Sequence, residues 1–163
     1  MAVVEPFGFE DVLSNIQKKT GAKRQDNTTI LRELQFIAEE ACNMARDTYK
    51  GGNPDAGTSH QDGGYDDHTR NLRGSIGYRI FYNGQVVAEG GFNGQGSPEG
   101  EAAAKSALEG VTGGKTLWEV VVVAGMHYAR YVEAKGYPVV TFVQGFLNEQ
   151  LTRLKQKIKA GKI

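Results

Sequence analysis

Hydrophobic residues recur at helical spacing in two long segments of the chain. Between residues 28 and 49 they stand three or four positions apart and predict one buried stripe, made of Leu31, Leu34, Ala38, Ala41, Ala45 and Tyr49. Asp26, Asn27 and Thr28 offer N-cap side chains at the start of this helix. A second stripe predicts a C-terminal amphipathic helix over 143–158, through Val143, Phe146, Leu147, Leu151, Leu154 and Ile158.

The pattern changes to an alternation of period two between residues 71 and 82, which predicts a strand. Asn83-Gly84 follows directly and is the strongest short-range signal for a tight hairpin turn. Residues 85–90 then form the return strand. We therefore expect a hairpin at about 72–90 that opens an antiparallel sheet.

The other elements are shorter. Ser97 as N-cap and Pro98 at the first helical position predict an inserted Ala-rich helix over 99–109. The remaining predictions are a weak helix over 9–19, a Val-rich strand over 117–124 partly buried on both faces, a short helix over 127–135 with Tyr128, Tyr131 and Val132 on a shared face, and a last strand over 139–142.

This order of helices and strands predicts an α+β fold, with helices packed on a small, mostly antiparallel sheet. We expect one domain spanning 1–163, with 1–27 as an N-terminal arm or short helix. Residues 50–69 are rich in Gly, Asp and His and predict a long flexible loop. Compact domains seldom carry such a loop without a functional or disordered role.

The charges balance over the whole chain, with 19 Lys and Arg against 19 Asp and Glu, so the chain as a whole is not an electrostatic nucleic-acid binder. The charge is uneven, however, because the end of the chain is basic. Its cations form either a solvated face or a contact with DNA or an acidic partner, and they include Arg153, Lys155, Lys157 and Lys159. The longest apolar run, residues 120–124, is too short to span a membrane.

Several residues are candidates for chemistry. Cys42 is the only cysteine, which excludes a disulfide within the chain, and its place beside the first stripe indicates a small core residue. Trp118 and His127 are expected to pack, the latter with hydrogen bonding near Tyr128 and Glu133. Gly113-Gly114-Lys115-Thr116 resembles the end of a phosphate loop but follows a helix and opens a strand, so a plain turn is favoured.

The loop before the hairpin carries oxygen and imidazole groups that could hold a divalent cation, although their spacing matches no calcium or zinc motif. A metal-dependent enzyme, with a nuclease as one option, is therefore the alternative function to weigh. The candidate ligands are His60, Asp62, Asp66, Asp67 and His68.

Two segments together carry a family resemblance. The first, HTRNLRGSI from residue 68 to 76, leads into a Tyr-bearing strand and the Asn-Gly turn. The second, VVVAGMHYARYVE from 121 to 133, is followed by Gly136 and a C-terminal amphipathic helix. In this order they resemble the head–tail joining or tail-completion (neck) proteins of long-tailed double-stranded DNA bacteriophages. The matching positions are Thr69, Leu72, Ser75, Ile76, Tyr128, Ala129, Val132 and Glu133. Arg70 departs from the family pattern, which shows Gly there.

The resemblance implies a structural virion protein with no active site and no cofactor. It implies a homo-oligomeric ring, a hexamer by family analogy, which connects portal and adaptor proteins to the tail tube and could contact packaged DNA. The expected locations are the neck or tail of the virion and, during assembly, the cytoplasm of the bacterial host. No membrane association is expected.

Overall fold

A four-stranded sheet with strand order β1-β4-β2-β3 lies at the centre of the molecule in the computed structural model. The structure describes residues 2–3, 27–47, 69–92, 94, 96–114, 116–137 and 139–163. The strands are β1 (Ala2–Val3), β2 (Ile76–Tyr82), β3 (Gln85–Gly90) and β4 (Trp118–Ala124), and every neighbouring pair is antiparallel. The α+β class with a small antiparallel sheet is thus confirmed.

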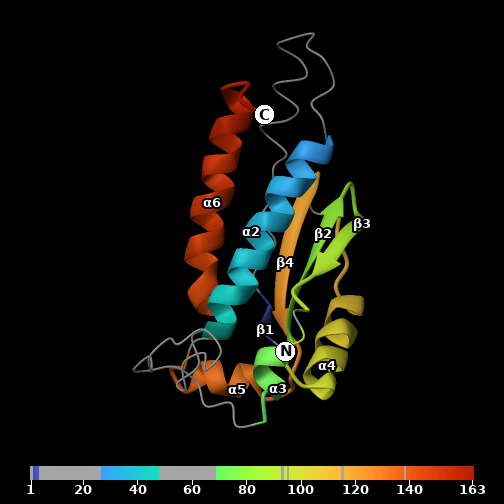
Figure 1. Cartoon of the computed structure of the whole chain (residues 1–163), viewed down its shortest axis with the longest axis vertical. Coiled ribbons are helices and arrows are strands. Elements are labelled where there is room, and N and C mark those ends of the chain that lie inside the picture. The colour runs from blue at the N-terminus through green and yellow to red at the C-terminus, as the bar shows by residue number, and fades with distance from the viewer. Residues whose placement is uncertain are drawn as a thin grey trace.

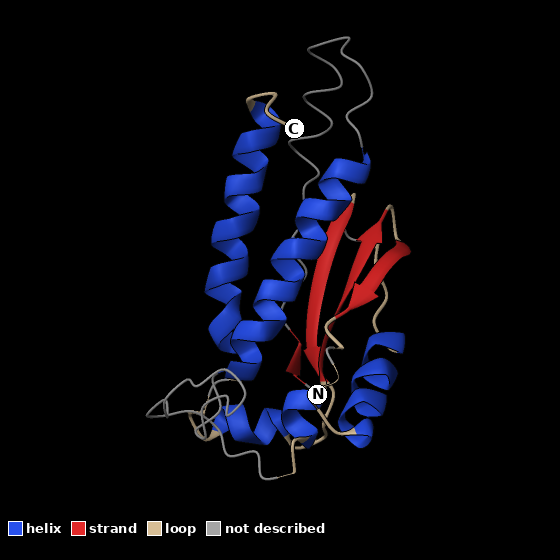
Figure 2. Ribbon diagram, viewed as in Figure 1, coloured by secondary structure: helices blue, strands red, loops and turns tan. Residues whose placement is uncertain are grey.

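Helices cover both faces of this sheet (Figures 1 and 2). On one face α2 and α6 run side by side in opposite directions, while α4 packs on the other, and α3 and α5 lie near one end of the sheet. The helices are α2 (Asn27–Asp47), α3 (Asn71–Gly74), α4 (Pro98–Glu109), α5 (Ala129–Ala134) and α6 (Thr141–Lys159).

The hairpin forms as the Asn-Gly signal predicts. Asn83 and Gly84 both take positive φ, 49° and 77°, which suits the right-handed twist of the two flanking strands. Tyr82 pairs with Gln85 directly across the turn. The Ser97 side chain accepts a hydrogen bond from the Gly100 amide, so the predicted cap of α4 is also confirmed.

Burial on two faces explains the composition of the central strands. In β2 the even positions Ile76, Tyr78 and Ile80 face the α2–α6 layer, and Phe81 faces α4. Every residue of β4 is buried, in keeping with its run of valines. The larger hydrophobic core lies between the sheet and the α2–α6 layer. Helix α6 contributes its stripe of Val143, Leu147, Leu151, Leu154 and Ile158. Helix α2 contributes Ile30 and Ile37 beside Leu34, Ala38, Ala41 and Ala45.

Two strand predictions were wrong in part. Residues 71–74 form α3, so β2 begins only at Ile76. The apolar segment 139–142 is not a strand, because α6 already begins at Thr141. The predicted helix over 9–19 and residues 50–68 of the predicted loop lie outside the described residues.

Candidate functional site

The two segments that carry the family resemblance meet at one end of the sheet. Ile76 opens β2 directly opposite Ala124, the last residue of β4. Just beyond this pair, the Gly125 amide donates a hydrogen bond of 2.8 Å to the Ser75 carbonyl. Segments that lie far apart in the sequence therefore form one continuous piece of backbone structure.

The residues of the first segment build this junction. Leu72, Ser75 and Ile76 are fully buried, and the Ser75 hydroxyl donates to the Leu72 carbonyl at 2.8 Å. Thr69 is exposed, and its hydroxyl accepts a bond of 3.3 Å from the Asn71 amide. All four residues thus shape or fill the turn before β2, which is a structural role.

Arg70 stands immediately before α3 with a left-handed backbone, φ 61° and ψ 12°. A side chain at positive φ costs free energy that glycine avoids. The Arg70 carbonyl accepts hydrogen bonds from the Gly74 amide at 3.0 Å and from the Ser97 amide at 3.3 Å. Position 70 therefore has the backbone conformation that favours Gly, the residue that neck proteins show there, although this chain has Arg.

Close glycine contacts bring α4 against this junction. A Cβ on Gly125 would lie 2.2 Å from the Ala103 carbonyl oxygen, and one on Gly100 would lie 2.3 Å from the Asn71 carbonyl oxygen. The Asn71 side chain also contacts the Ser97 hydroxyl and donates a bond of 3.1 Å to Glu99. Backbone approaches this close are possible only without a side chain.

A buried arginine ties α2 to the same point. Arg46 donates from its guanidinium to the Ile76 carbonyl at 3.0 Å and to the Asn43 side chain at 2.9 Å. Sequence reasoning missed this residue. The sequence did contain a signal, because Arg46 lies on the apolar face of α2, one turn after Cys42. A cation in that place is buried and must find hydrogen-bond partners.

The second segment divides between core and surface. Ala129 is fully buried, and Tyr128 and Val132 are half-buried against the larger core. Tyr131, predicted on the same face, is instead 64% exposed. The predicted shared face is thus wrong for Tyr131, because α5 begins only at Ala129 and only its opposite side meets the core.

Glu133 determines where α6 begins. Its Oε1 accepts bonds from the Val139, Val140 and Thr141 amides at 3.2, 2.7 and 2.8 Å, and from the Thr141 hydroxyl at 3.0 Å. A carboxylate at a helix N-terminus satisfies unpaired amides and interacts favourably with the helix dipole. This explains why residues 139–142 enter a helix although their composition indicates a strand. The hydrogen bonding expected around His127 does not join it to Glu133 within the described residues, because the Glu133 Oε1 bonds to the start of α6.

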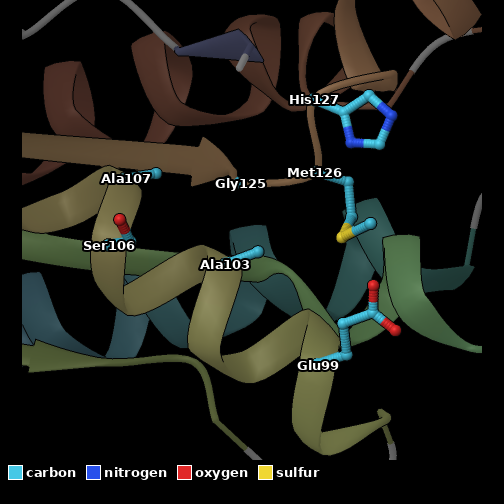
Figure 3. Close-up of a pocket in the computed structure, with 7 residues that line it drawn as sticks. All are labelled: Glu99, Ala103, Ser106, Ala107, Gly125, Met126 and His127. Atoms are coloured by element: carbon cyan, nitrogen blue, oxygen red, sulfur yellow. The ribbon is translucent and has the colours of Figure 1, made fainter.

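A shallow pocket of about 380 Å³ lies between α4 and the segment after β4 (Figure 3). Its lining combines the small residues Ala103, Ala107 and Gly125 and the side chain of Met126 with the polar residues Glu99, Ser106 and His127. Figure 3 shows Ser106 at the opposite end from Glu99 and His127. These three residue types match a hydrolase triad in composition alone, because no hydrogen bond joins any two of them among the described residues. His127 instead meets Tyr128 edge-on, with ring centroids 5.1 Å apart.

Two amides of the Gly113–Thr116 turn are occupied by a side chain of the protein. Glu119, buried in β4, accepts bonds at its Oε1 from the Gly114 amide at 2.7 Å and the Thr116 amide at 2.9 Å. A phosphate would need these donors. The geometry agrees with a plain turn, and Glu119 is another structural carboxylate that the sequence did not reveal.

The basic residues of α6 do not form one face. Because a helix turns about 100° per residue, Arg153 and Lys157 lie on one flank of the buried stripe, and Lys155 and Lys159 lie on the other. Arg153 pairs with Glu149 at 2.5 Å, and Lys157 pairs with Glu33 of α2 at 3.3 Å. The split weakens the case for a continuous DNA-binding surface on this helix.

Burial shifts the pKa values of two described side chains, Cys42 and Tyr78. Cys42 is fully buried, as predicted, and burial raises the pKa of its thiol to about 12. Burial also raises the pKa of Tyr78, and the carboxylate of Glu39, which accepts its hydrogen bond, adds to the effect. Glu39 further accepts a bond of 3.2 Å from the Gly91 amide, which ties α2 to the end of β3.

The five candidate metal ligands, His60, Asp62, Asp66, Asp67 and His68, lie outside the described residues. Within the described ranges, no cluster of three or more His, Cys, Asp or Glu side chains is placed to hold a metal ion. None of the helices in that part of the chain is long and apolar enough to cross a membrane.

Comparison with known proteins gave no match to a family model, to a curated protein or to a solved structure.

Proposed function

We propose that this chain is a structural subunit of a tailed-phage virion, which forms a ring at the head–tail junction and connects the portal and adaptor proteins to the tail tube. The observation that carries the proposal is the junction of Ser75 with Gly125. It joins the two segments that resemble neck proteins at one end of the sheet. The left-handed backbone at Arg70 adds support, because it suits the Gly of the family pattern.

The use of the polar groups agrees with a structural role. Glu133 binds the start of α6, Glu119 binds the turn before β4, and Glu39 accepts hydrogen bonds from Tyr78 and the Gly91 amide. Groups committed to several hydrogen bonds with the chain itself are poorly suited to acid–base catalysis. The family positions contribute packing and backbone geometry, as expected of a scaffold.

Gene silencing during infection tests this proposal. Without the protein, we expect DNA-filled heads and complete tails that fail to join, and joined infectious particles once the wild-type gene is supplied in trans. Normal joined particles in its absence would overturn the proposal.

A metal-dependent enzyme built on His60, Asp62, Asp66, Asp67 and His68 is the competing function. Mass spectrometry of the purified native protein separates the two. Stoichiometric metal that is lost together with an activity in His60→Ala or Asp66→Ala would favour the enzyme.

A further inference from the structure

Two exposed hydrophobic patches lie on separate parts of the molecule. The corner patch, where α5 turns into α6, consists of Tyr131, Tyr137 and Phe142, which are 64%, 45% and 52% exposed. The hairpin patch consists of Val86 and Val87 of β3, which are 49% and 39% exposed. In Figure 1, α5 lies at the bottom of the molecule and the β2–β3 hairpin lies toward the upper right. Five of the six large hydrophobic side chains that are exposed in the described chain belong to these two segments, which makes the two segments candidates for contact surfaces.

A β-bulge creates the hairpin patch. Ile80 pairs with Ala88 and Phe81 pairs with Val86, so Val87 is an extra residue in β3. A bulge re-aims side chains and blocks regular pairing of an edge strand with another strand. The patch is therefore suited to side-chain packing rather than to strand addition.

The exposed charges beside the two patches are opposite. At the corner, Arg130 and Lys135 are exposed, and the Lys135 ammonium lies 5.2 Å from the ring centroid of Tyr131. The nearby carboxylate of Glu133 is occupied by the start of α6. The corner thus presents aromatic side chains with cations around them.

Among the described residues beside the hairpin patch, the exposed charges are carboxylates. Arg79 bonds to Glu89 of β3 at 2.7 Å and to the Leu108 carbonyl at 2.6 Å, which places the end of α4, with Glu109, next to β3. The Arg79 side chain itself is only 13% exposed, against 45% for Glu89. Glu109 is exposed, and Glu89 stays 45% exposed although Arg79 pairs with it, so these two carboxylates are the described charges that a partner can meet.

From this complementarity we propose that the corner patch of one copy of the chain docks on the hairpin patch of the next copy. The contact joins two different surfaces, so it is heterologous and propagates from copy to copy until it closes into a ring. The inference rests on the proposed ring and names the surfaces that build it. Apolar packing supplies the affinity, and the opposite charges orient the approach.

Two serine variants test this contact in solution. Tyr131→Ser with Phe142→Ser removes the corner patch, and Val86→Ser with Val87→Ser removes the hairpin patch. Sedimentation velocity, with concentration raised to the solubility limit, should show wild-type oligomers but each variant alone as a monomer. A 1:1 mixture of the two variants retains one intact pair of surfaces, so it should stop at a heterodimer. Phe36→Ser, which removes an exposed aromatic of α2 that belongs to neither patch, is the control and should assemble normally.

A photo-crosslinking amino acid at position 131 tests the same contact in phage particles. We expect a cross-link to residues 85–90 of a second copy, recognised by mixing isotope-labelled and unlabelled protein. The inference would be overturned if the mixture stayed monomeric or if either variant alone still formed full oligomers. Cross-links from one corner patch to another, or to another protein, would also overturn it. If the chain is absent from particles while the mixture forms the heterodimer, the proposed function fails and the assignment of the surfaces stands.

Discussion

The Gly125 amide donates a 2.8 Å hydrogen bond to the Ser75 carbonyl, and this bond joins the end of β4 to the start of β2. Ala103 of α4 packs against the same glycine, and Arg46 of α2 binds the neighbouring carbonyl of Ile76. Helix α2, the sheet and helix α4 therefore meet at this junction. Changes at this junction should be felt in the stability of the whole fold.

Gly125→Ala should destabilise the protein by about 2–3 kcal/mol, because the new Cβ meets backbone atoms that cannot move aside. Urea unfolding followed by circular dichroism measures the change. Gly145→Ala is the matched control. At this exposed position in α6 the new Cβ meets nothing within 4 Å beyond its chain neighbours and the backbone of its own helix. The higher helix propensity of alanine should therefore stabilise by about 0.5–1 kcal/mol. Equal effects at the two positions would contradict the packing at Gly125.

Arg70→Gly should stabilise the protein by up to about 1 kcal/mol, since glycine takes positive φ without steric cost. Arg70→Val should destabilise it, because a β-branched side chain fits this region poorly. Thermal unfolding of the two variants beside wild type gives the order. A glycine variant less stable than the valine variant would rule out the left-handed conformation.

Glu133→Ala should cost about 1–2 kcal/mol, comparable with the loss of a helix N-cap, and α6 should fray at its start. Glu133→Gln keeps an oxygen acceptor but loses the charge, so its loss should be smaller. Hydrogen exchange of the amides of Val140 and Thr141 reports the change locally. Glu149→Ala, which removes only a surface ion pair with Arg153, should change stability by less than about 0.5 kcal/mol. Unchanged exchange in Glu133→Ala would show that the carboxylate does not hold the helix.

Stability should fall as the pH rises above about 9. The unfolded chain releases the Cys42 proton near the ordinary pKa of 9.0, whereas the folded chain keeps it until about 12, so the unfolded state binds fewer protons in this window. The raised pKa of Tyr78 acts with the same sign from about pH 10 upward. Urea midpoints from about pH 7 to about pH 10 should decline less steeply in Cys42→Ala than in wild type. Parallel declines would contradict the burial of a neutral thiol.

The sequence predicted the turn and the helix start that neighbouring residues determine by themselves. Asn83-Gly84 specified the hairpin because both residues tolerate positive φ, and Ser97-Pro98 specified the start of α4. The alternation in β2 reports which residues face the α2–α6 layer, and the stripe in α6 reports burial. The sequence therefore predicted the fold class well.

Contacts between distant residues explain the errors. The segment 139–142 has strand-forming residues, but it contains the start of α6 because Glu133, a residue of α5, accepts hydrogen bonds from its amides. The buried carboxylate of Glu119 and the buried Arg46 gained their roles only when the sheet, the turn and α2 came together. The docking patches also depended on structure, because the bulge at Val87 and the exposure of Tyr131 follow from strand register and the start of α5.

Electron cryomicroscopy of intact virions, with the chain located by a bound antibody fragment, tests the central claim most directly. We predict a closed ring of this chain between the portal and adaptor proteins and the tail tube, with six copies by family analogy. Within that ring, the corner patch of each copy should face the hairpin patch of the next. A virion that lacks the chain, or that carries it away from the head–tail junction, would contradict the account.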